Sequence, residues 1–190
     1  MTPGVRLRPA PTGVELADMY PAPHQHALFG AGHDLRVRVS TAVGRWLAVD
    51  CDAATVADLS CGDGAIALGS LPPSQSTAAV LGDLAPGWPI CGPIEDTLPD
   101  LAPVDLFVCT ETLEHIDDPA GVLETVRGKA RRLLVSFPHR GDLDDNPEHV
   151  WQWSPWDAGD LLGGAGWEAA TWLHLEVPDG PYSYTIWGCR

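Results

Sequence analysis

Short apolar stretches alternate with helix-forming stretches through the middle of the chain. Each apolar stretch has about the length of one β-strand, and those that we expect as strands span residues 56–59, 77–81, 104–109 and 132–137. Strands that alternate with helices form parallel sheets whose faces the helices cover. The pattern therefore predicts an α/β fold with a mostly parallel sheet.

The first 50 residues have a different pattern. Residues 1–12 are rich in proline and arginine and are expected to be disordered or draped over the surface, and residues 14–20 form one or two helical turns. From His33 to Val49 apolar residues recur at helical spacing, which predicts an amphipathic helix over one face of the sheet. We expect residues 1–50 to cover a core of residues 51–190 as a lid, within a single domain of residues 1–190.

The last part of the chain predicts a helix and then a hairpin. The segment 154–157 (SPWD) has the form of a capping box that opens a helix, which ends either at Gly163-Gly164 or at Gly166. Residues 167–187 contain two apolar stretches separated by the turn 178–181, which predicts an antiparallel pair of strands. Earlier, Asp118-Pro119 is expected to open another helix, with proline at its first position.

The most informative turn follows the first strand. There the sequence reads Asp58-x-Ser60-x-Gly62-x-Gly64 before a helix-forming stretch. Glycines in such a turn let the backbone approach a ligand and leave N–H groups facing it. The second strand ends in Asp83, about 20 residues farther on, where nucleotide-binding α/β folds place an acid against ribose hydroxyls. The alternative is an ordinary βα turn, with a solvated acid at the strand end.

These features, together with the segment 113–119 (LEHIDDP) after the third strand, resemble class I S-adenosylmethionine-dependent methyltransferases over residues 55–167. The resemblance implies an enzyme with a Rossmann-like fold and S-adenosylmethionine as its cofactor. It implies that Asp83 binds the ribose and that residues 109–111 lie near the methionine or the adenine. The cofactor-binding residues expected on this basis are Asp58, Ser60, Cys61, Gly62, Gly64, Asp83, Ile94, Glu95, Cys109, Thr110 and Glu111.

The connection after Asp83 departs from the family pattern. The next apolar stretch begins at Pro89, whereas a parallel crossover normally takes about a dozen residues or more. The helix of this crossover must be missing, so we expect the edge strand to be short, displaced or absent, with Trp88 filling the space. Pro93 stands where the family often has an acid against the adenine amino group, so this contact is expected from Ile94 or Glu95.

A second group of polar residues follows the third strand. Glu111, Glu114 and His115 form the pattern ExxEH, which places them on one face if the segment is helical, and His149 follows later. Two carboxylates and two imidazoles suit a divalent cation with open positions for a substrate oxygen. The pattern is similar to the metal-using ubiquinone-pathway O-methyltransferases and small-RNA 3′-terminal 2′-O-methyltransferases. We predict Mg²⁺ or another divalent metal at these four residues; alternatively, Glu114 and His115 only hold the segment against the sheet.

Several further side chains are candidates for the chemistry. Histidine is the usual base near neutral pH, and the candidate catalytic residues are His115, His149 and His139. The candidates for substrate contact in the N-terminal segment are Tyr20, His24, His26 and His33. Three tryptophans are expected to pack a loop onto the core, with an apolar acceptor pocket as the alternative: Trp151, Trp153 and Trp156.

The composition of the chain limits the classes of partner that we expect it to bind. The net charge of −15, from 26 acidic and 11 basic residues, disfavours nucleic acid, because the protein would repel the phosphate backbone. The five cysteines show no CxxC spacing and are expected to be reduced and mostly buried. The sequence shows no signal peptide, and no apolar run approaches the roughly 20 residues of a membrane span. We expect a soluble, cytoplasmic protein that does not bind membranes.

The favoured function is methyl transfer from S-adenosylmethionine to a small-molecule acceptor. Oxygen is the favoured acceptor atom, and a divalent metal is one possible aid to its methylation. Nitrogen is the second choice of acceptor atom. One alternative is methylation of the 2′-oxygen at an RNA 3′ terminus. The other is a nucleotide-binding scaffold without catalysis, which the shortened connection and Ser60 in place of a glycine motivate.

Overall fold

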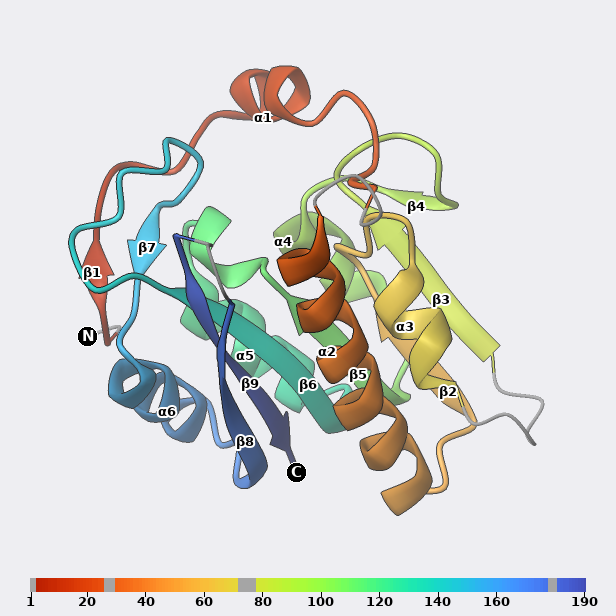
Figure 1. Ribbon diagram of the computed structural model, residues 1–190. Helices are drawn as coiled ribbons and strands as arrows, with labels where there is room; N and C mark the ends of the chain where they lie inside the picture. Colours follow the sequence, from red (N-terminus) through yellow and green to blue (C-terminus); the bar gives the residue numbers. More distant parts are fainter. Residues whose placement is uncertain (1–2, 26–29, 72–77, 178–180) are drawn as a thin grey trace.

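A seven-stranded sheet forms the centre of the molecule in the computed structural model (Figure 1). The structure describes residues 3–25, 30–71, 78–177 and 181–190. The strand order is β4-β3-β2-β5-β6-β9-β8. The strands span Thr55–Asp58 (β2), Ala78–Asp83 (β3), Ile90–Cys91 (β4), Val104–Thr110 (β5), Ala130–His139 (β6), Ala169–Glu176 (β8) and Ser183–Cys189 (β9).

The pairing confirms the predicted sheet, which is mostly parallel and ends in an antiparallel hairpin. Strands β4, β3, β2, β5 and β6 run parallel, and β9 pairs antiparallel with both β6 and β8. Thr77, predicted to open the second strand, lies outside the described residues, as does the predicted hairpin turn apart from Pro181. The carboxyl ends of the parallel strands meet at one edge of the sheet, so the loops that follow them lie together.

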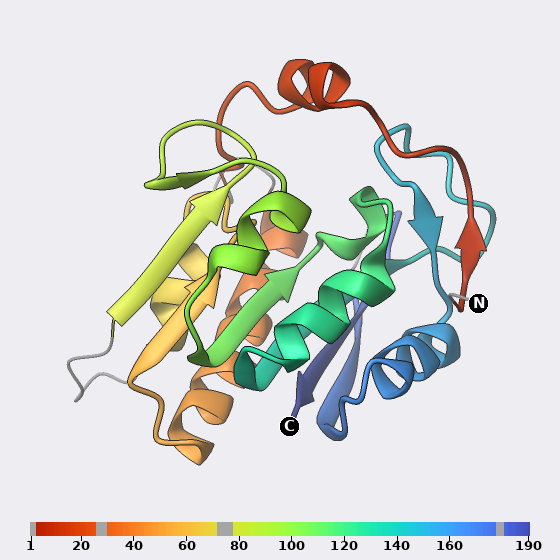
Figure 2. The ribbon, with the colours of Figure 1, turned by 180° about the vertical axis from the view of Figure 1, so that it is seen from behind.

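Helices cover both faces of the sheet (Figures 1 and 2). Each face has its own apolar core, one around Leu47 of the first helix layer and one around Leu123 of the second. Parallel strands need this double cover, because they are apolar on both faces. The first layer is α2 (Ala31–Asp50) and α3 (Ala65–Ser70), and the second is α4 (Ile94–Thr97), α5 (Pro119–Arg127) and α6 (Pro155–Gly164).

The helix starts follow the predicted capping chemistry. The Ser154 side chain accepts a hydrogen bond from the Asp157 backbone N–H, and the Asp157 carboxylate accepts from the Ser154 N–H, which is the expected capping box. The Asp118 side chain caps α5 by accepting from the Gly121 N–H. The sequence therefore predicts where α5 and α6 begin, since each cap satisfies a backbone donor that lacks a partner inside the helix.

The connection from β3 to β4 is short and contains no helix, as predicted. The edge strand β4 has two residues and, within the described ranges, pairs only with Gly82 and Asp83 at the end of β3. Trp88 lies in the connection, and its indole N–H donates to the Gly62 carbonyl at 2.8 Å. The tryptophan therefore braces the turn after β2, close to the place where a crossover helix would pack.

The N-terminal segment crosses the edge of the sheet at which the parallel strands end (Figures 1 and 2). Strand β1 (Val5–Arg6) pairs antiparallel with β7 (Trp151–Gln152). Helix α1 (Gly13–Met19) follows and begins with a capping box between Thr12 and Glu15. Residues 3–12 are therefore draped over the surface, which was one of the two expected outcomes.

Two of the three tryptophans pack as expected. Trp153 is 2% exposed, its ring stacks on Trp151 with centroids 6.1 Å apart, and Phe137 meets it edge-on at 5.3 Å. Trp156 is 81% exposed. None of the three lines the cavity described below. The pocket alternative for these tryptophans is therefore wrong.

All five cysteines are free, and only Cys91 is exposed. This agrees with reduced, mostly buried thiols. Among the helices of the described ranges, none combines the length and the apolarity that a membrane span requires.

Candidate functional site

A cavity of about 790 Å³ opens where the parallel strands end. Its walls come from the turns after β2, β3 and β5, from β9 and α2, and from the segment around α1. Open α/β sheets bind ligands at this edge, outside the carboxyl ends of their strands. The predicted cofactor-binding residues that line the cavity are Asp58, Ser60, Cys61, Gly62, Asp83, Ile94, Glu95, Thr110 and Glu111.

The other two predicted cofactor residues do not line the cavity. Cys109 is 1% exposed and belongs to the apolar core. Gly64 precedes α3 with a left-handed φ of 78°, and a Cβ there would lie 3.3 Å from the side chain of Leu81. Glycine at this position therefore shapes the turn, because left-handed backbone favours a residue without Cβ.

The turn after β2 is held together by its own side chains. Asp58 is 2% exposed, and its Oδ1 accepts hydrogen bonds from the Ser60 N–H at 3.0 Å and the Ser60 hydroxyl at 3.3 Å. The Ser60 hydroxyl also lies 2.7 Å from the hydroxyl of Thr112. Ser60, which replaces a glycine of the family pattern, thus links the turn after β2 to the loop after β5.

Burial raises the pKa of Asp58 from 3.8 to about 7, despite the hydrogen bonds from Ser60. Between these two values the folded state holds a proton that the unfolded state has lost, so this group makes stability fall as pH rises. Asp58→Asn keeps the acceptor oxygen and removes the titration. We expect the free energy of unfolding of the wild type, relative to that variant, to fall by roughly 1 kcal/mol per pH unit across this window, measured by urea denaturation. A difference that stays constant with pH contradicts the raised pKa.

Asp83 connects the end of β3 to the same turn. Its Oδ2 accepts from the Gly62 N–H at 2.7 Å, and its Oδ1 accepts from the Ala85 N–H at 2.9 Å. Each carboxylate oxygen has a second lone pair, so Asp83 keeps the capacity to accept hydrogen bonds from a ligand in the cavity. Ile94 and Glu95 lie at the start of α4 and line the cavity near the loop after β4.

The ExxEH residues share one face only if their segment is helical, and the structure does not meet this condition. Only Leu113–His115 form a helical turn, of the 3-10 type (η3), and Glu111 has a left-handed φ of 53°. The Glu111 carboxylate accepts a hydrogen bond from the Ser136 hydroxyl at 2.7 Å. A non-glycine residue in this conformation is strained by about 1–3 kcal/mol, and such strain concentrates at functional sites. Glu111 therefore does not share one helical face with Glu114 and His115.

Glu114 and His115 are in contact with each other. Glu114 is 1% exposed, and its Oε2 has no hydrogen-bond partner among the described residues. Burial, followed by the charge of Glu111, raises the pKa of Glu114 well above its ordinary value, and burial lowers the pKa of His115 to about 4. The 3.6 Å contact between Glu114 Oε1 and His115 Nε2 is therefore not an ion pair at neutral pH. His115 Nδ1 lies 3.1 Å from the Glu148 carbonyl oxygen, which assigns the proton to Nδ1 and leaves the Nε2 lone pair toward Glu114.

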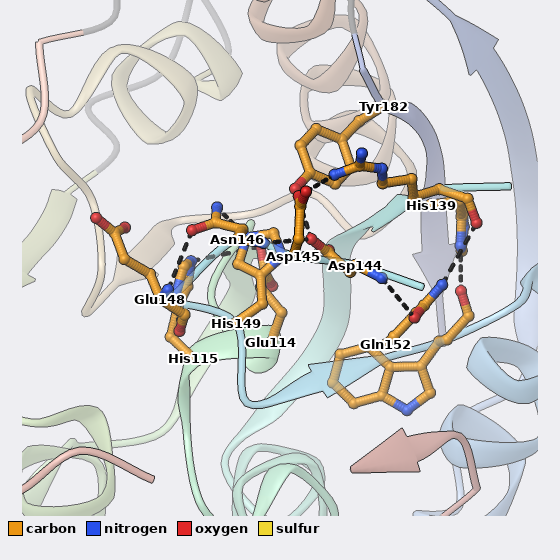
Figure 3. Close-up of polar contacts among 12 residues, drawn as sticks. Glu114, His115, His139, Asp144, Asp145, Asn146, Glu148, His149, Gln152 and Tyr182 are labelled. Atoms are coloured by element: carbon orange, nitrogen blue, oxygen red, sulfur yellow. Dashed lines mark hydrogen bonds and ion pairs between the residues drawn. The ribbon is translucent and has the colours of Figure 1, made fainter. Parts of the chain in front are cut away.

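Asp144 orients His149 in the same way (Figure 3). His149 Nδ1 lies 2.6 Å from Asp144 Oδ2, and both residues are 5% exposed. Tyr182 donates its hydroxyl hydrogen to the other oxygen of Asp144 at 2.7 Å. His149 Nε2 lies 3.1 Å from Asn146 Nδ2, which donates to it. The proton is thus on Nδ1, and the lone pair of His149 is on Nε2.

Glu114, His115 and His149 form one group, which we call the Glu-His-His cluster. One oxygen of the carboxylate and one nitrogen of each imidazole all lie within 4.8 Å of one another. The rings of the two histidines have centroids 5.0 Å apart. Two imidazoles with oriented N–H groups, beside a carboxylate with an unpartnered oxygen, are a donor set that fits a divalent metal. The cluster contains three of the four predicted ligands and leaves Glu111 out.

The remaining histidine predictions have different outcomes. His139 does not line the cavity; its Nδ1 lies 2.7 Å from the Trp153 carbonyl oxygen and its Nε2 lies 2.6 Å from the Thr185 hydroxyl. With both nitrogens engaged inside the protein, His139 holds β6 against its neighbours. His24 and His33 line the cavity, and His26 lies outside the described residues.

Tyr20 contacts the region of the cluster. Its hydroxyl donates to Glu148 Oε2 at 3.1 Å and lies 3.3 Å from His115 Nδ1. Burial, followed by the charge of Glu148, raises the pKa of Tyr20, so the phenol remains protonated. The segment after α1 is therefore hydrogen-bonded to the loop that carries His149.

Sequence reasoning missed several residues around the site. Asp144 and Asn146 precede His149 in one loop, and their hydrogen bonds to its ring appear only in the folded chain. Tyr182 and Tyr184 belong to the C-terminal hairpin and line the cavity. A run of polar residues before a candidate histidine (DLDDNPEH) was the only available signal for Asp144.

No protein-family model and no curated protein sequence matches the chain. Solved structures match it at low identity. The 1,6-didemethyltoxoflavin-N1-methyltransferase of Burkholderia thailandensis, with bound 1,6-didemethyltoxoflavin and S-adenosylhomocysteine, is 17% identical with a TM-score of 0.64, over 98% of this chain and 93% of that one. The magnesium protoporphyrin IX methyltransferase ChlM of Synechocystis PCC 6803, with bound SAM, is 17% identical with a TM-score of 0.60, over 94% of this chain and 91% of that one.

A third match has a different activity. The [4+2]-cyclase SpnF is 13% identical to the chain, with a TM-score of 0.69 over 96% of this chain and 97% of that one. Together, these likenesses show that the chain has the class I methyltransferase fold. A cyclase among the matches illustrates that a fold does not by itself determine the reaction.

Proposed function

We propose that this chain is an S-adenosylmethionine-dependent methyltransferase that acts on a small-molecule acceptor, with oxygen as the acceptor atom. The observation that carries the proposal is one cavity in which the predicted cofactor residues and the Glu-His-His cluster meet. At about 790 Å³ the cavity falls within the size range of small-molecule sites. The two methyltransferases above, whose structures hold S-adenosylhomocysteine and SAM, support the choice of cofactor.

The cofactor roles follow from position. The turn of Ser60 and Gly62 lies at the end of β2, where its backbone would approach the methionyl chain of the cofactor. Asp83 would accept hydrogen bonds from the ribose hydroxyls, and Ile94 and Glu95 would contact the adenine. Thr110 and Glu111, at the end of β5, would lie near the methionyl group, between the cofactor and the cluster.

Methylation of a hydroxyl requires a group that accepts the hydroxyl proton. As the acceptor oxygen bonds to the methyl carbon, the bond from carbon to sulfur breaks and its electron pair stays on sulfur, which yields S-adenosylhomocysteine. The hydroxyl proton must also leave. His149, whose ring is oriented by Asp144, would accept that proton at Nε2 in place of the hydrogen bond that Asn146 donates there.

A divalent cation offers a second route. Glu114, His115 and His149 would hold it, and it would supply Lewis acidity toward the acceptor oxygen. Two imidazoles and one carboxylate suit manganese, iron or zinc better than magnesium, which prefers oxygen ligands. Because both routes use the Nε2 lone pair of His149, they exclude each other.

The test is transfer of a labelled methyl group from S-adenosylmethionine to a panel of hydroxylated small molecules. We expect turnover of at least one. Activity that is lost in EDTA and restored by Mn²⁺, Zn²⁺ or Mg²⁺ supports the metal route, and activity that EDTA leaves unchanged supports His149 as the base. Cofactor binding without turnover on any acceptor supports the scaffold alternative instead.

Replacement of Asp83 by alanine is expected to weaken S-adenosylhomocysteine binding by about 1–3 kcal/mol, because the ribose hydroxyls lose their acceptor. Calorimetric titration measures this effect. The matched control is Glu168→Ala, whose side chain is 69% exposed on the far hairpin. Because Asp83 also accepts from Gly62, thermal unfolding of both variants must be recorded. An unchanged affinity in a folded variant removes Asp83 from the cofactor site.

The RNA alternative shares the cluster but conflicts with the charge. A net charge of −15 opposes phosphate contacts, whose contribution to binding appears as a steep dependence on salt. Filter binding of a short RNA at two salt concentrations distinguishes the acceptors. We expect no retention of RNA at either concentration, and salt-sensitive retention would favour an RNA acceptor.

A further inference from the structure

A buried guanidinium without full hydrogen bonding lies in the wall of the cavity. Arg36, on α2, is 3% exposed and lines the cavity. Its Nε and Nη1 have no hydrogen-bond partner within the described ranges. Its Nη2 lies 3.4 Å from His33 Nε2. A buried charge is destabilising unless it is paired, so a folded chain seldom keeps one without a reason.

The neighbours of Arg36 do not provide the missing pair. The guanidinium carbon lies 5.6 Å from the ring centroid of Tyr184, a cation–π contact that leaves the N–H groups unbonded. Glu111 is near enough for the charge of Arg36 to lower its pKa, although burial raises that pKa more strongly. The Glu111 carboxylate instead accepts from Ser136. Among the described residues, no carboxylate forms an ion pair with Arg36.

We infer that Arg36 binds a carboxylate of a small molecule held in this cavity. The guanidinium presents its donors in a planar fork that matches a carboxylate, so the pair compensates the buried charge and orients the ligand. The inference rests on the proposed function and deepens it. A carboxylate reaches the cavity from two sources: the methionyl end of the cofactor, or an acceptor that carries an acid group.

The test compares Arg36→Gln with the wild type by calorimetry, using two cofactor probes. S-adenosylhomocysteine carries the carboxylate, and its decarboxylated analogue, S-adenosyl-3-thiopropylamine, keeps the amine and lacks it. If the cofactor supplies the carboxylate, Arg36→Gln lowers the affinity for S-adenosylhomocysteine by at least about tenfold. The affinity for the decarboxylated analogue stays unchanged. Binding of the analogue then also shows that the variant is folded.

The acceptor is tested with benzoate and neutral benzamide, by ligand-observed NMR on protein saturated with S-adenosylhomocysteine. If the acceptor supplies the carboxylate, the wild type binds benzoate in preference to benzamide. Arg36→Gln then loses that preference, while its affinity for the cofactor stays unchanged. The matched control is Arg38→Gln on the same helix, whose side chain is 68% exposed and pairs with Asp34. We expect this control to behave as the wild type in every arm.

Two outcomes distinguish a failure of the role of Arg36 from a failure of the methyltransferase proposal. An Arg36→Gln variant that binds S-adenosylhomocysteine and benzoate as the wild type does overturns the role of Arg36 and leaves the methyltransferase proposal intact. A wild type that binds neither adenosine probe overturns the methyltransferase proposal and this inference with it.

Discussion

Replacement of His149 by alanine is expected to lower the rate of methyl transfer by about 10²–10⁴-fold, with little change in the affinity for S-adenosylhomocysteine. The reason is that His149 Nε2 is required in either route, as the base or as a metal ligand, while the cofactor residues lie on other loops. Single-turnover kinetics with labelled cofactor measure the rate, and calorimetry measures the affinity.

Two further variants distinguish chemistry from folding. His174→Ala removes an exposed histidine of β8 and is expected to leave the rate unchanged. Asp144→Asn keeps a side chain of the same shape beside His149 Nδ1 and is expected to lower the rate, because the imidazole loses the anionic partner that orients it. A His149→Ala variant that binds the cofactor and retains the wild-type rate contradicts the assignment.

Replacement of Trp153 by alanine is expected to reduce the free energy of unfolding by about 3–5 kcal/mol. The side chain is 2% exposed, and it packs against Trp151 and Phe137. Its indole N–H also donates to the Pro3 carbonyl at 2.9 Å, which fastens the N-terminal segment to the core. Urea denaturation measures the change.

The control for this prediction is Trp156→Ala. Trp156 is 81% exposed, so its loss is expected to change the free energy of unfolding by no more than about 0.5 kcal/mol. Trp153→Phe preserves most of the buried ring and loses the N–H, and its effect should lie between those of the two alanine variants. Equal effects of Trp153→Ala and Trp156→Ala would contradict the packing.

The strands of the sheet and the starts of its helices can be predicted from the sequence because the patterns that mark them are local. Apolar stretches mark the buried strands, and caps such as Ser154 and Asp118 mark helix starts, since each satisfies backbone donors within a few residues. The missing crossover helix follows from chain length alone, because the connection before Pro89 is too short to hold one. None of these inferences needs a contact between distant segments.

The site is harder to predict from the sequence because it depends on backbone conformation and on contacts between segments that are far apart in the chain. The ExxEH spacing predicts one helical face, yet the left-handed backbone at Glu111 turns that carboxylate toward Ser136. Asp144 matters only because its loop folds back onto His149. The pattern that marks Arg36 as part of the helix covering the sheet does not reveal that its guanidinium is buried at the cavity wall without full pairing.

Calorimetric titration of the wild-type protein with S-adenosylhomocysteine tests most directly whether the cavity binds S-adenosylmethionine. We expect saturable binding at one site per chain, weakened in Asp83→Ala and preserved in His149→Ala. Absence of binding at millimolar ligand, by a protein shown to be folded, would contradict this expectation.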